Sequence, residues 1–290
     1  MKVKSVFSSV LVIAVAGLTL IFSLGFRSSD EDLTAESLIQ RHIASIAPAE
    51  RLKERRTFVM KGDCQYKVLV GGAKIAPGPG ITQIVSEGQA YNITVKFDTG
   101  EYGGEQYVTD GKNARTAYST PSDRNPMTEF LQAQQELFTE GLFGGELTTA
   151  WALLDVKGRK PKLTFKGLED VDGRQLYELD YRFRKGGYDL TNKLYFEPET
   201  FHHVLSTYEV QIAAPMGANP TDSARQRPSR YKVEERFADF KDFDGFTLPA
   251  DWTIQFSQST TDSTLLLQWS TVFTQSALDM QIPPGIFKVK

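Results

Sequence analysis

Residues 177–184 read YELDYRFR, and bulky apolar side chains alternate with charged ones throughout. Tyr177, Leu179, Tyr181 and Phe183 take every second position. Successive side chains of a β-strand point to opposite faces of its sheet. The stretch therefore predicts a strand with one aromatic, buried face and one charged, solvent-facing side, which is typical of antiparallel sheets.

The same period of two recurs along much of the chain. It is found in residues 91–97, 204–212, 231–237, 252–256 and 265–273. Asp-Gly or Gly-Gly pairs stand between several candidate strands, at 110–111, 172–173, 186–187 and 244–245. Glycine there favours the positive φ of tight hairpin turns. These segments predict a succession of antiparallel strands.

Two regions have helical character instead. Residues 30–48 place apolar side chains at helical spacing and end at Pro48. Residues 126–157 lack the period of two, and their apolar spacing predicts two amphipathic helices. The Gly-rich stretch EGLFGGEL (140–147) is expected to connect them.

The order of segments predicts the architecture. A helix comes first, then several strands, two helices and about seven more strands, so the fold class is mainly β (α+β). A sheet this wide must curl, and its concave apolar face needs a cover, which the inserted helices can supply. We expect residues 29–290 to form a single domain.

Inward-facing apolar positions of these strands are the candidate lining of a hydrophobic cavity. They are Tyr91, Ile93, Tyr177, Leu179, Tyr181, Phe183, Tyr208, Trp252, Ile254, Phe256 and Trp269. If the helices fill the concave face completely, these residues form only a core. If the helices fall short, the side chains line a cavity for an apolar ligand.

The first 28 residues resemble an export signal. Lys2 and Lys4 precede a charge-free, mostly apolar run over 6–26, which Arg27 follows. The run fits a secretory leader and is also long enough to cross a membrane as a helix. Residues 1–28 are therefore a signal peptide or an N-terminal anchor. Either outcome places the remainder in an extracytoplasmic compartment, which we take to be a periplasm.

Charge and cysteine content exclude other classes. The net charge of −3 gives no general attraction to nucleic acid. Cys64 is the only cysteine, so the chain forms no internal disulfide. Because Cys64 shares a strand face with apolar side chains, we expect a small buried residue, with a reactive thiol as the second interpretation.

The adjacent His202 and His203 are the most conspicuous candidates for chemistry. Pro198 ends one strand and residues 197–201 form a turn, so the two histidines begin the next strand and point to opposite faces. They are poorly placed to hold one ion together, and His42 is far away along the chain. We predict no metal, no cofactor and no catalytic residue. The sequence does not exclude a pair of catalytic carboxylates.

Several local phrases together resemble a known family. They are VTDGKNARTAY (108–118), LYFEPETFHHV (194–204), FKDFDGFTLPADWTIQF (240–256) and IPPGIFKV (282–289), with the inserted helices between the first two. In this order they resemble the bacterial periplasmic lipoprotein-carrier superfamily, the LolA/LolB-like outer-membrane lipoprotein-sorting proteins. The resemblance covers most of residues 33–289.

The resemblance implies an incomplete antiparallel β-barrel, covered by helices, whose cavity holds acyl chains during transit through the periplasm. It transfers no named functional residue. The predicted function is a non-catalytic, monomeric carrier for lipid or lipidated protein, with a transfer partner in the inner or outer membrane. A membrane-anchored interaction or sensor module with a filled core is the alternative. An envelope hydrolase that uses carboxylates or His202 and His203 is less favoured.

Overall fold

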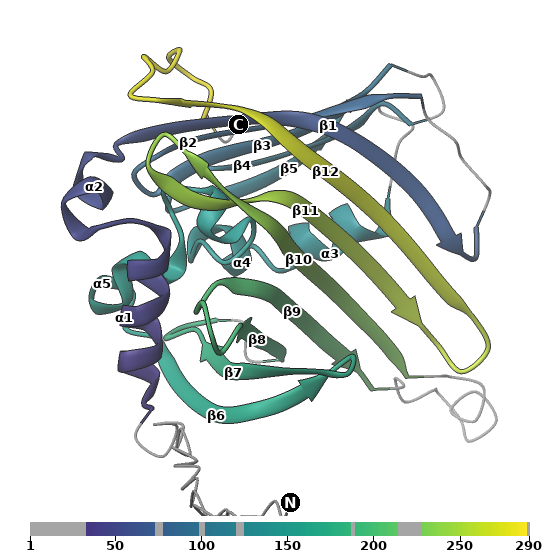
Figure 1. Ribbon diagram of the computed structural model, residues 1–290. Coiled ribbons are helices and arrows are strands. Elements are labelled where there is room, and N and C mark those ends of the chain that lie inside the picture. The colour runs from purple at the N-terminus through teal and green to yellow at the C-terminus, as the bar shows by residue number, and fades with distance from the viewer. Residues whose placement is uncertain are drawn as a thin grey trace, which may run out of the picture. The chain divides into compact units, whose positions relative to one another are not determined.

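The computed structural model describes residues 33–72, 78–98, 102–119, 125–186, 189–213 and 228–288 (Figure 1). The expected leader, residues 1–28, lies outside these ranges, as do residues 214–227. Within the described ranges, no helix combines the length and the apolar character needed to cross a bilayer.

Twelve strands in the described residues form one antiparallel sheet. They are β1 (Thr57–Val70), β2 (Gly80–Glu87), β3 (Ala90–Phe97), β4 (Gly104–Thr109), β5 (Ala114–Tyr118), β6 (Lys162–Val171), β7 (Arg174–Arg182), β8 (Leu190–Phe196), β9 (His203–Ile212), β10 (Ser229–Phe243), β11 (Phe246–Ser259) and β12 (Thr264–Leu278). Five strands precede the helical region and seven follow it, and the sequence predicts several and about seven. The mainly β fold with a curved, open sheet is confirmed.

The chain enters this sheet in its middle. The strand order is β5-β4-β3-β2-β1-β12-β11-β10-β9-β8-β7-β6, so β1 pairs with the last strand, β12. From β1 the chain runs outward to the edge strand β5, crosses to the other edge at β6, and returns strand by strand to the centre. One connection between the edges therefore has to pass across a face of the sheet.

The N-terminal helices follow their local signals. Thr34 caps α1 (Ala35–Ile46), because its hydroxyl accepts a hydrogen bond from the Ser37 amide at 3.2 Å. The apolar side of α1 is buried, including Leu38 and Ile39. After Pro48 the chain begins a second, six-residue helix, α2 (Ala49–Glu54), which the sequence analysis did not predict.

Residues 125–159, which we call the insert, make the crossing between the two edges. The insert contains α3 (Pro126–Ala133), α4 (Glu136–Thr139), the 3₁₀ turns η2 (Gly145–Leu147) and η3 (Ala152–Asp155), and α5 (Val156–Arg159). The sheet curls around this segment in Figure 1. The prediction of two amphipathic helices in residues 126–157 is wrong in detail. The first is divided into α3 and α4, and short turns take the place of the second.

Glycine explains the irregular path of the insert. Gly141 and Gly144 have φ of 69° and 85°, a left-handed conformation that side chains disfavour. A Cβ atom on Gly141 would lie 1.8 Å from the carbonyl oxygen of Ala150. The Gly-rich stretch is therefore no exposed connection: Leu142, Phe143 and Leu147 are completely buried.

Alanine substitutions at two glycines distinguish the steric cost of this close approach from the cost of a positive φ alone. Gly88 also has positive φ, 56°, but a Cβ there meets no atom within 4 Å. We expect Gly88→Ala to lower the free energy of unfolding by about 1 kcal/mol and Gly141→Ala by about 3 kcal/mol or more, measured by urea denaturation. Equal losses would contradict the tight packing of the insert.

Candidate functional site

Aromatic rings from both halves of the sheet hold the insert. Phe143 packs edge-on against Trp252 of β11, with ring centroids 5.9 Å apart. Phe138 stacks on Tyr107 of β4 at 5.8 Å. Because contacts reach strands on both sides of β1 and β12, the insert fills the concave face between the two halves.

The predicted lining residues are all buried. Tyr91, Ile93, Leu179, Tyr181, Tyr208 and Phe256 have no exposed surface, while Trp252, Ile254, Trp269, Tyr177 and Phe183 are 1%, 2%, 2%, 4% and 8% exposed. A side chain that lines a water-filled void keeps accessible surface. At these positions the described structure is thus packed and closed, and their role in binding an acyl chain stays a prediction.

Glu235 on β10 is the first of three buried carboxyl groups that join the insert to the sheet. Its Oε1 atom accepts hydrogen bonds from the Gly144 amide at 2.8 Å and from Trp252 Nε1 at 3.0 Å. Its Oε2 atom lies 2.8 Å from the hydroxyl of Tyr208, which is also 3.0 Å from the carbonyl oxygen of Leu142. Burial raises the pKa of Glu235 to about 8.

Glu105 on β4 is the second carboxyl group and fixes the start of the insert. It accepts hydrogen bonds from the Asn125 amide group and the Thr128 hydroxyl of the insert. On the sheet side, the hydroxyls of Tyr102 and Tyr107 donate to it. Burial raises the pKa of this carboxyl, and the four donors oppose that shift.

Glu146 is the third carboxyl group and belongs to the insert itself. Its Oε2 atom is 3.0 Å from Nδ1 of His203 on β9, whose Nε2 is 2.9 Å from the Ser206 hydroxyl. The Glu146 carbonyl accepts from the buried guanidinium of Arg55 at 2.9 Å. Burial raises the pKa of the Glu146 carboxyl to about 7 and lowers that of Arg55 to about 9.

His42 on α1 completes this cluster. Its Nε2 accepts a hydrogen bond from Trp151 Nε1 at 2.9 Å, so the imidazole proton is on Nδ1, which donates to the Phe201 carbonyl at 3.0 Å. This pairing requires a neutral ring. Burial lowers the pKa of His42 to about 4 and that of His203 to about 3.

Ser206, His203 and Glu146 follow the order of groups in serine hydrolases, where a hydroxyl, an imidazole and a carboxyl are hydrogen-bonded in series. None of the three is more than 1% exposed. A substrate cannot reach the Ser206 hydroxyl while the insert is in place, and the carboxyl would leave with the insert. In this conformation the three groups join the insert to β9.

The two adjacent histidines separate as the sequence predicts. Residues 197–201 form the turn between β8 and β9, with Phe201 at φ 59°. His203 points into the interior, whereas the half-buried His202 stacks on Phe240 at 4.1 Å. His42 is distant along the chain but close in space, because its ring centroid lies 6.1 Å from that of His203. No group of three or more metal-ligating side chains occurs among the described residues.

Sequence reasoning missed the three glutamates, although a signal exists for Glu235. Tyr231, Val233 and Phe237 define the inward positions of β10, and Glu235 falls on the same side of that alternation. A charged residue at an inward position of a strand is informative, because burying a carboxyl is costly unless it is hydrogen-bonded.

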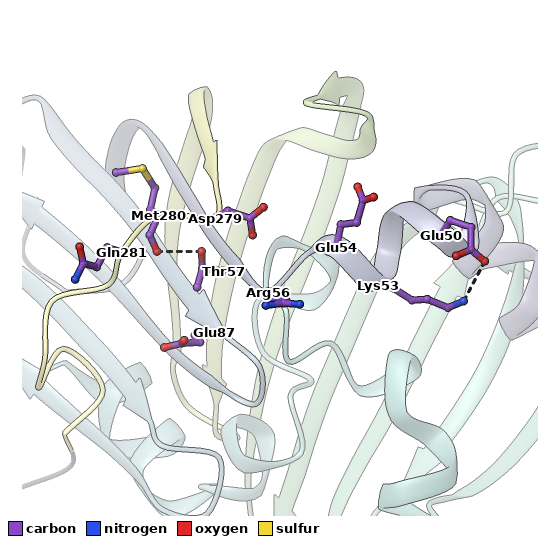
Figure 2. Close-up of a pocket in the computed structure, with 9 residues that line it drawn as sticks. All are labelled: Glu50, Lys53, Glu54, Arg56, Thr57, Glu87, Asp279, Met280 and Gln281. Carbon is purple, nitrogen blue, oxygen red and sulfur yellow. Dashed lines mark hydrogen bonds and ion pairs between the residues drawn. The ribbon is translucent and has the colours of Figure 1, made fainter.

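A pocket on the surface is lined mainly by charged side chains, unlike the predicted apolar lining. Figure 2 shows this pocket of about 630 Å³ beside α2, where Lys53 contacts Glu50 and the Thr57 hydroxyl donates to the Met280 carbonyl. Its walls are lined by Glu50, Lys53, Glu54, Arg56, Thr57, Glu87, Asp279, Met280 and Gln281. Six of these nine side chains are charged, and none belongs to the predicted apolar lining.

Comparison with known proteins gives similarity in solved structures alone. No protein-family model and no curated protein matches the chain. A "putative outer membrane lipoprotein-sorting protein domain" from Vibrio parahaemolyticus is 8% identical, with a TM-score of 0.39, over 86% of this chain and 97% of that one.

Two structures of MucB with MucA are also similar. The MucA/MucB complex of Pseudomonas aeruginosa gives 9% identity and a TM-score of 0.22, over 84% of this chain and 98% of that one. MucB in complex with MucA(peri) gives 10% and 0.20, over 86% and 100%. Likeness at this level concerns the fold alone, and the fold described above rests on the sheet itself.

Ser206→Ala tests the role of the buried trio. We expect a loss of about 1–2 kcal/mol in unfolding free energy, because His203 Nε2 loses its partner in a buried site. The native protein should not react with a fluorophosphonate probe. Labelling of the wild-type chain that Ser206→Ala abolishes would show a reactive serine and contradict a purely structural role.

His203 should make folding sensitive to acid. Its folded pKa of about 3 lies below the ordinary 6.5, so the unfolded chain takes up this proton first as the pH falls. The stability that neutral His203 provides is present above pH 6.5 and is lost below it. We expect the stability of His203→Asn relative to wild type to rise by up to about 1.4 kcal/mol per pH unit from pH 6.5 to 4. Urea denaturation at several pH values measures this difference, and a constant difference would contradict it.

Proposed function

We propose that the chain is a non-catalytic binding and carrier protein for the acyl chains of lipid or lipidated protein. An acyl chain would occupy the concave face after the insert moves aside. The observation that carries the proposal is the way the insert is held. Within the described residues, no backbone–backbone hydrogen bond joins the insert to a strand, and the polar links run through side chains.

Attachment through side chains allows an acyl chain to replace the insert on the concave face. Strands are joined to their neighbours by continuous ladders of backbone hydrogen bonds, so the sheet can persist without the insert. Within the described residues, the longest helix of the insert is α3, which has eight residues. Helices this short have little stability of their own, since nucleation is unfavourable. Moving the insert therefore disrupts mainly side-chain packing and the buried carboxyl contacts.

For residues 142–147 of the insert, the energies of exchange are of similar size. Burying an aliphatic chain of about 14 methylenes yields on the order of 10 kcal/mol. Leu142, Phe143 and Leu147 of the insert are fully buried, and each is worth about 1.5–3 kcal/mol when buried. An acyl chain that replaces these side chains on the aromatic face thus compensates for their loss.

Tyr91 supports an interior that reopens. Its hydroxyl is buried and has no hydrogen-bond partner among the described residues. An unsatisfied buried polar group costs about 1–3 kcal/mol, which a permanent core normally avoids. Tyr91 is also one of the predicted lining residues.

We place this activity in the periplasm, because the pattern of residues 1–28 favours export or an anchor. The protein would act as a monomer and exchange its cargo with a partner in the inner or outer membrane. A second candidate is an envelope interaction or sensor module of the same fold with a permanently filled interior. The very low exposure of the predicted lining residues favours this alternative.

Quenching by a brominated fatty acid distinguishes the two candidates. The chain has three tryptophans, Trp151, Trp252 and Trp269, and none is more than 2% exposed. Bromine quenches indole fluorescence only in contact. We expect a saturable loss of fluorescence on titration, whereas acrylamide, a water-soluble quencher, should have little effect on the ligand-free protein.

Single-tryptophan variants locate the bound chain. A variant with Phe in place of Trp151 and Trp269 leaves Trp252, which contacts the insert through Phe143, as the reporter. We expect strong quenching of Trp252. Absence of quenching at saturating fatty acid, or binding without quenching, would exclude the interior as the acyl site and favour the interaction module.

A further inference from the structure

The hydrogen bonds around Glu235 indicate whether its carboxyl group carries a proton. The hydroxyl of Tyr208 has one proton, yet it lies within hydrogen-bond distance of both Leu142 O and Glu235 Oε2. Both contacts are satisfied together only if Glu235 Oε2 has its own proton and donates it to Tyr208. The other oxygen, Oε1, then accepts from the Gly144 amide and Trp252 Nε1.

The neutral carboxyl therefore satisfies every group in this set. If Glu235 were ionised, the Tyr208 hydroxyl would donate its hydrogen bond to the carboxylate. Leu142 O would then keep only the Gly145 amide as a donor. Ionisation would also place a charge in an apolar site where, among the described residues, no lysine or arginine forms an ion pair with Glu235. A buried, unpaired charge is expensive, and hydration of the carboxylate relieves that penalty.

We propose that Glu235 is a proton-controlled latch, whose neutral form holds residues 142–144 of the insert against β9 and β11 and whose ionised form releases them. The latch regulates access to the interior that we propose as the acyl-binding site, so its functional meaning rests on that proposal. Its operation can be measured without any ligand.

Groups from every neighbouring element face this carboxyl. Tyr208 comes from β9, Trp252 from β11 and Tyr91 from β3, and all three are neutral at ordinary pH. The insert contributes Glu146, whose negative charge would further disfavour ionisation of Glu235. His203 contacts Glu146 and stays neutral above its lowered pKa.

The sign of the pH effect follows from the raised pKa. A carboxyl with a folded pKa of about 8 and an ordinary value of 4.5 stabilises the closed insert fully at low pH. This contribution falls by up to about tenfold in the closing equilibrium per pH unit as the pH rises toward 8, and levels off above it. The latch therefore opens in the alkaline direction.

Hydrogen–deuterium exchange of residues 142–147 in the full chain tests the latch between pH 6.5 and 9. His42 and His203 do not titrate in this range. Glu146 titrates nearby, so the comparison uses Glu146→Gln with and without Glu235→Gln. Arg55, whose pKa is lowered to about 9 and which donates to the Glu146 carbonyl, is unchanged in both variants, so their comparison removes its effect. The side chain that Glu235→Gln introduces keeps an amide oxygen that can accept from Gly144 and Trp252, and its amide nitrogen can donate to Tyr208.

After correction for intrinsic exchange, Glu146→Gln should lose protection by up to about tenfold per pH unit to pH 8 and remain level above. The double variant should show constant protection. Tyr208→Phe, which removes the link to Leu142 that the neutral form allows, should lower protection below pH 8. Protection that is independent of pH in Glu146→Gln, or that falls equally in both variants, would overturn the latch.

The same variants separate this inference from the proposed function. If uptake of brominated fatty acid accelerates with pH in Glu146→Gln but not in the double variant, the latch controls acyl binding. A pH-dependent latch with no fatty acid uptake leaves the latch standing and removes acyl binding. Uptake with pH-independent protection removes the latch alone.

Discussion

An irregular stretch of backbone lies in the apolar interior of this protein, and its polar groups must find partners there. Residues 140–148 combine left-handed glycines with a short 3₁₀ turn, so the regular hydrogen bonds of a long helix are missing. The carboxyl group of Glu235 accepts from the Gly144 amide of this stretch, while those of Glu105 and Glu146 join the insert to the sheet through side-chain contacts. Burial raises the pKa of all three carboxyls and lowers that of the neighbouring His42 and His203.

The sequence predicts the sheet well because strand signals are local. Alternation over eight residues, as in 177–184, identifies a strand and its inward face. The turn at 197–201 and the opposite orientations of His202 and His203 follow from Pro198 and the geometry of a strand. Each of these inferences involves neighbours in the chain, where sterics limit the choices.

The buried polar cluster could not be predicted in this way. His42, Glu146 and His203 come from α1, the insert and β9, and only the course of the chain across the sheet brings them together. Glycine spacing in 140–147 suggests a connection between helices, but whether that connection is exposed or buried depends on what lies above it. Of the missed residues, Glu235 alone had a usable signal, because its position in the alternation of β10 is inward.

Strand order explains why the insert can serve as both core and cover. Since β1 pairs with β12 at the centre, the two halves of the sheet stay joined by backbone hydrogen bonds whatever the insert does. At one edge, the Gln132 side chain of α3 accepts from the Thr116 amide of β5 and so protects that strand from pairing. At the other edge, β6 has lysines and a register shift between Phe165 and Gly167, which also disfavour pairing. The two edges therefore remain apart, the sheet stays open, and the insert closes its concave face.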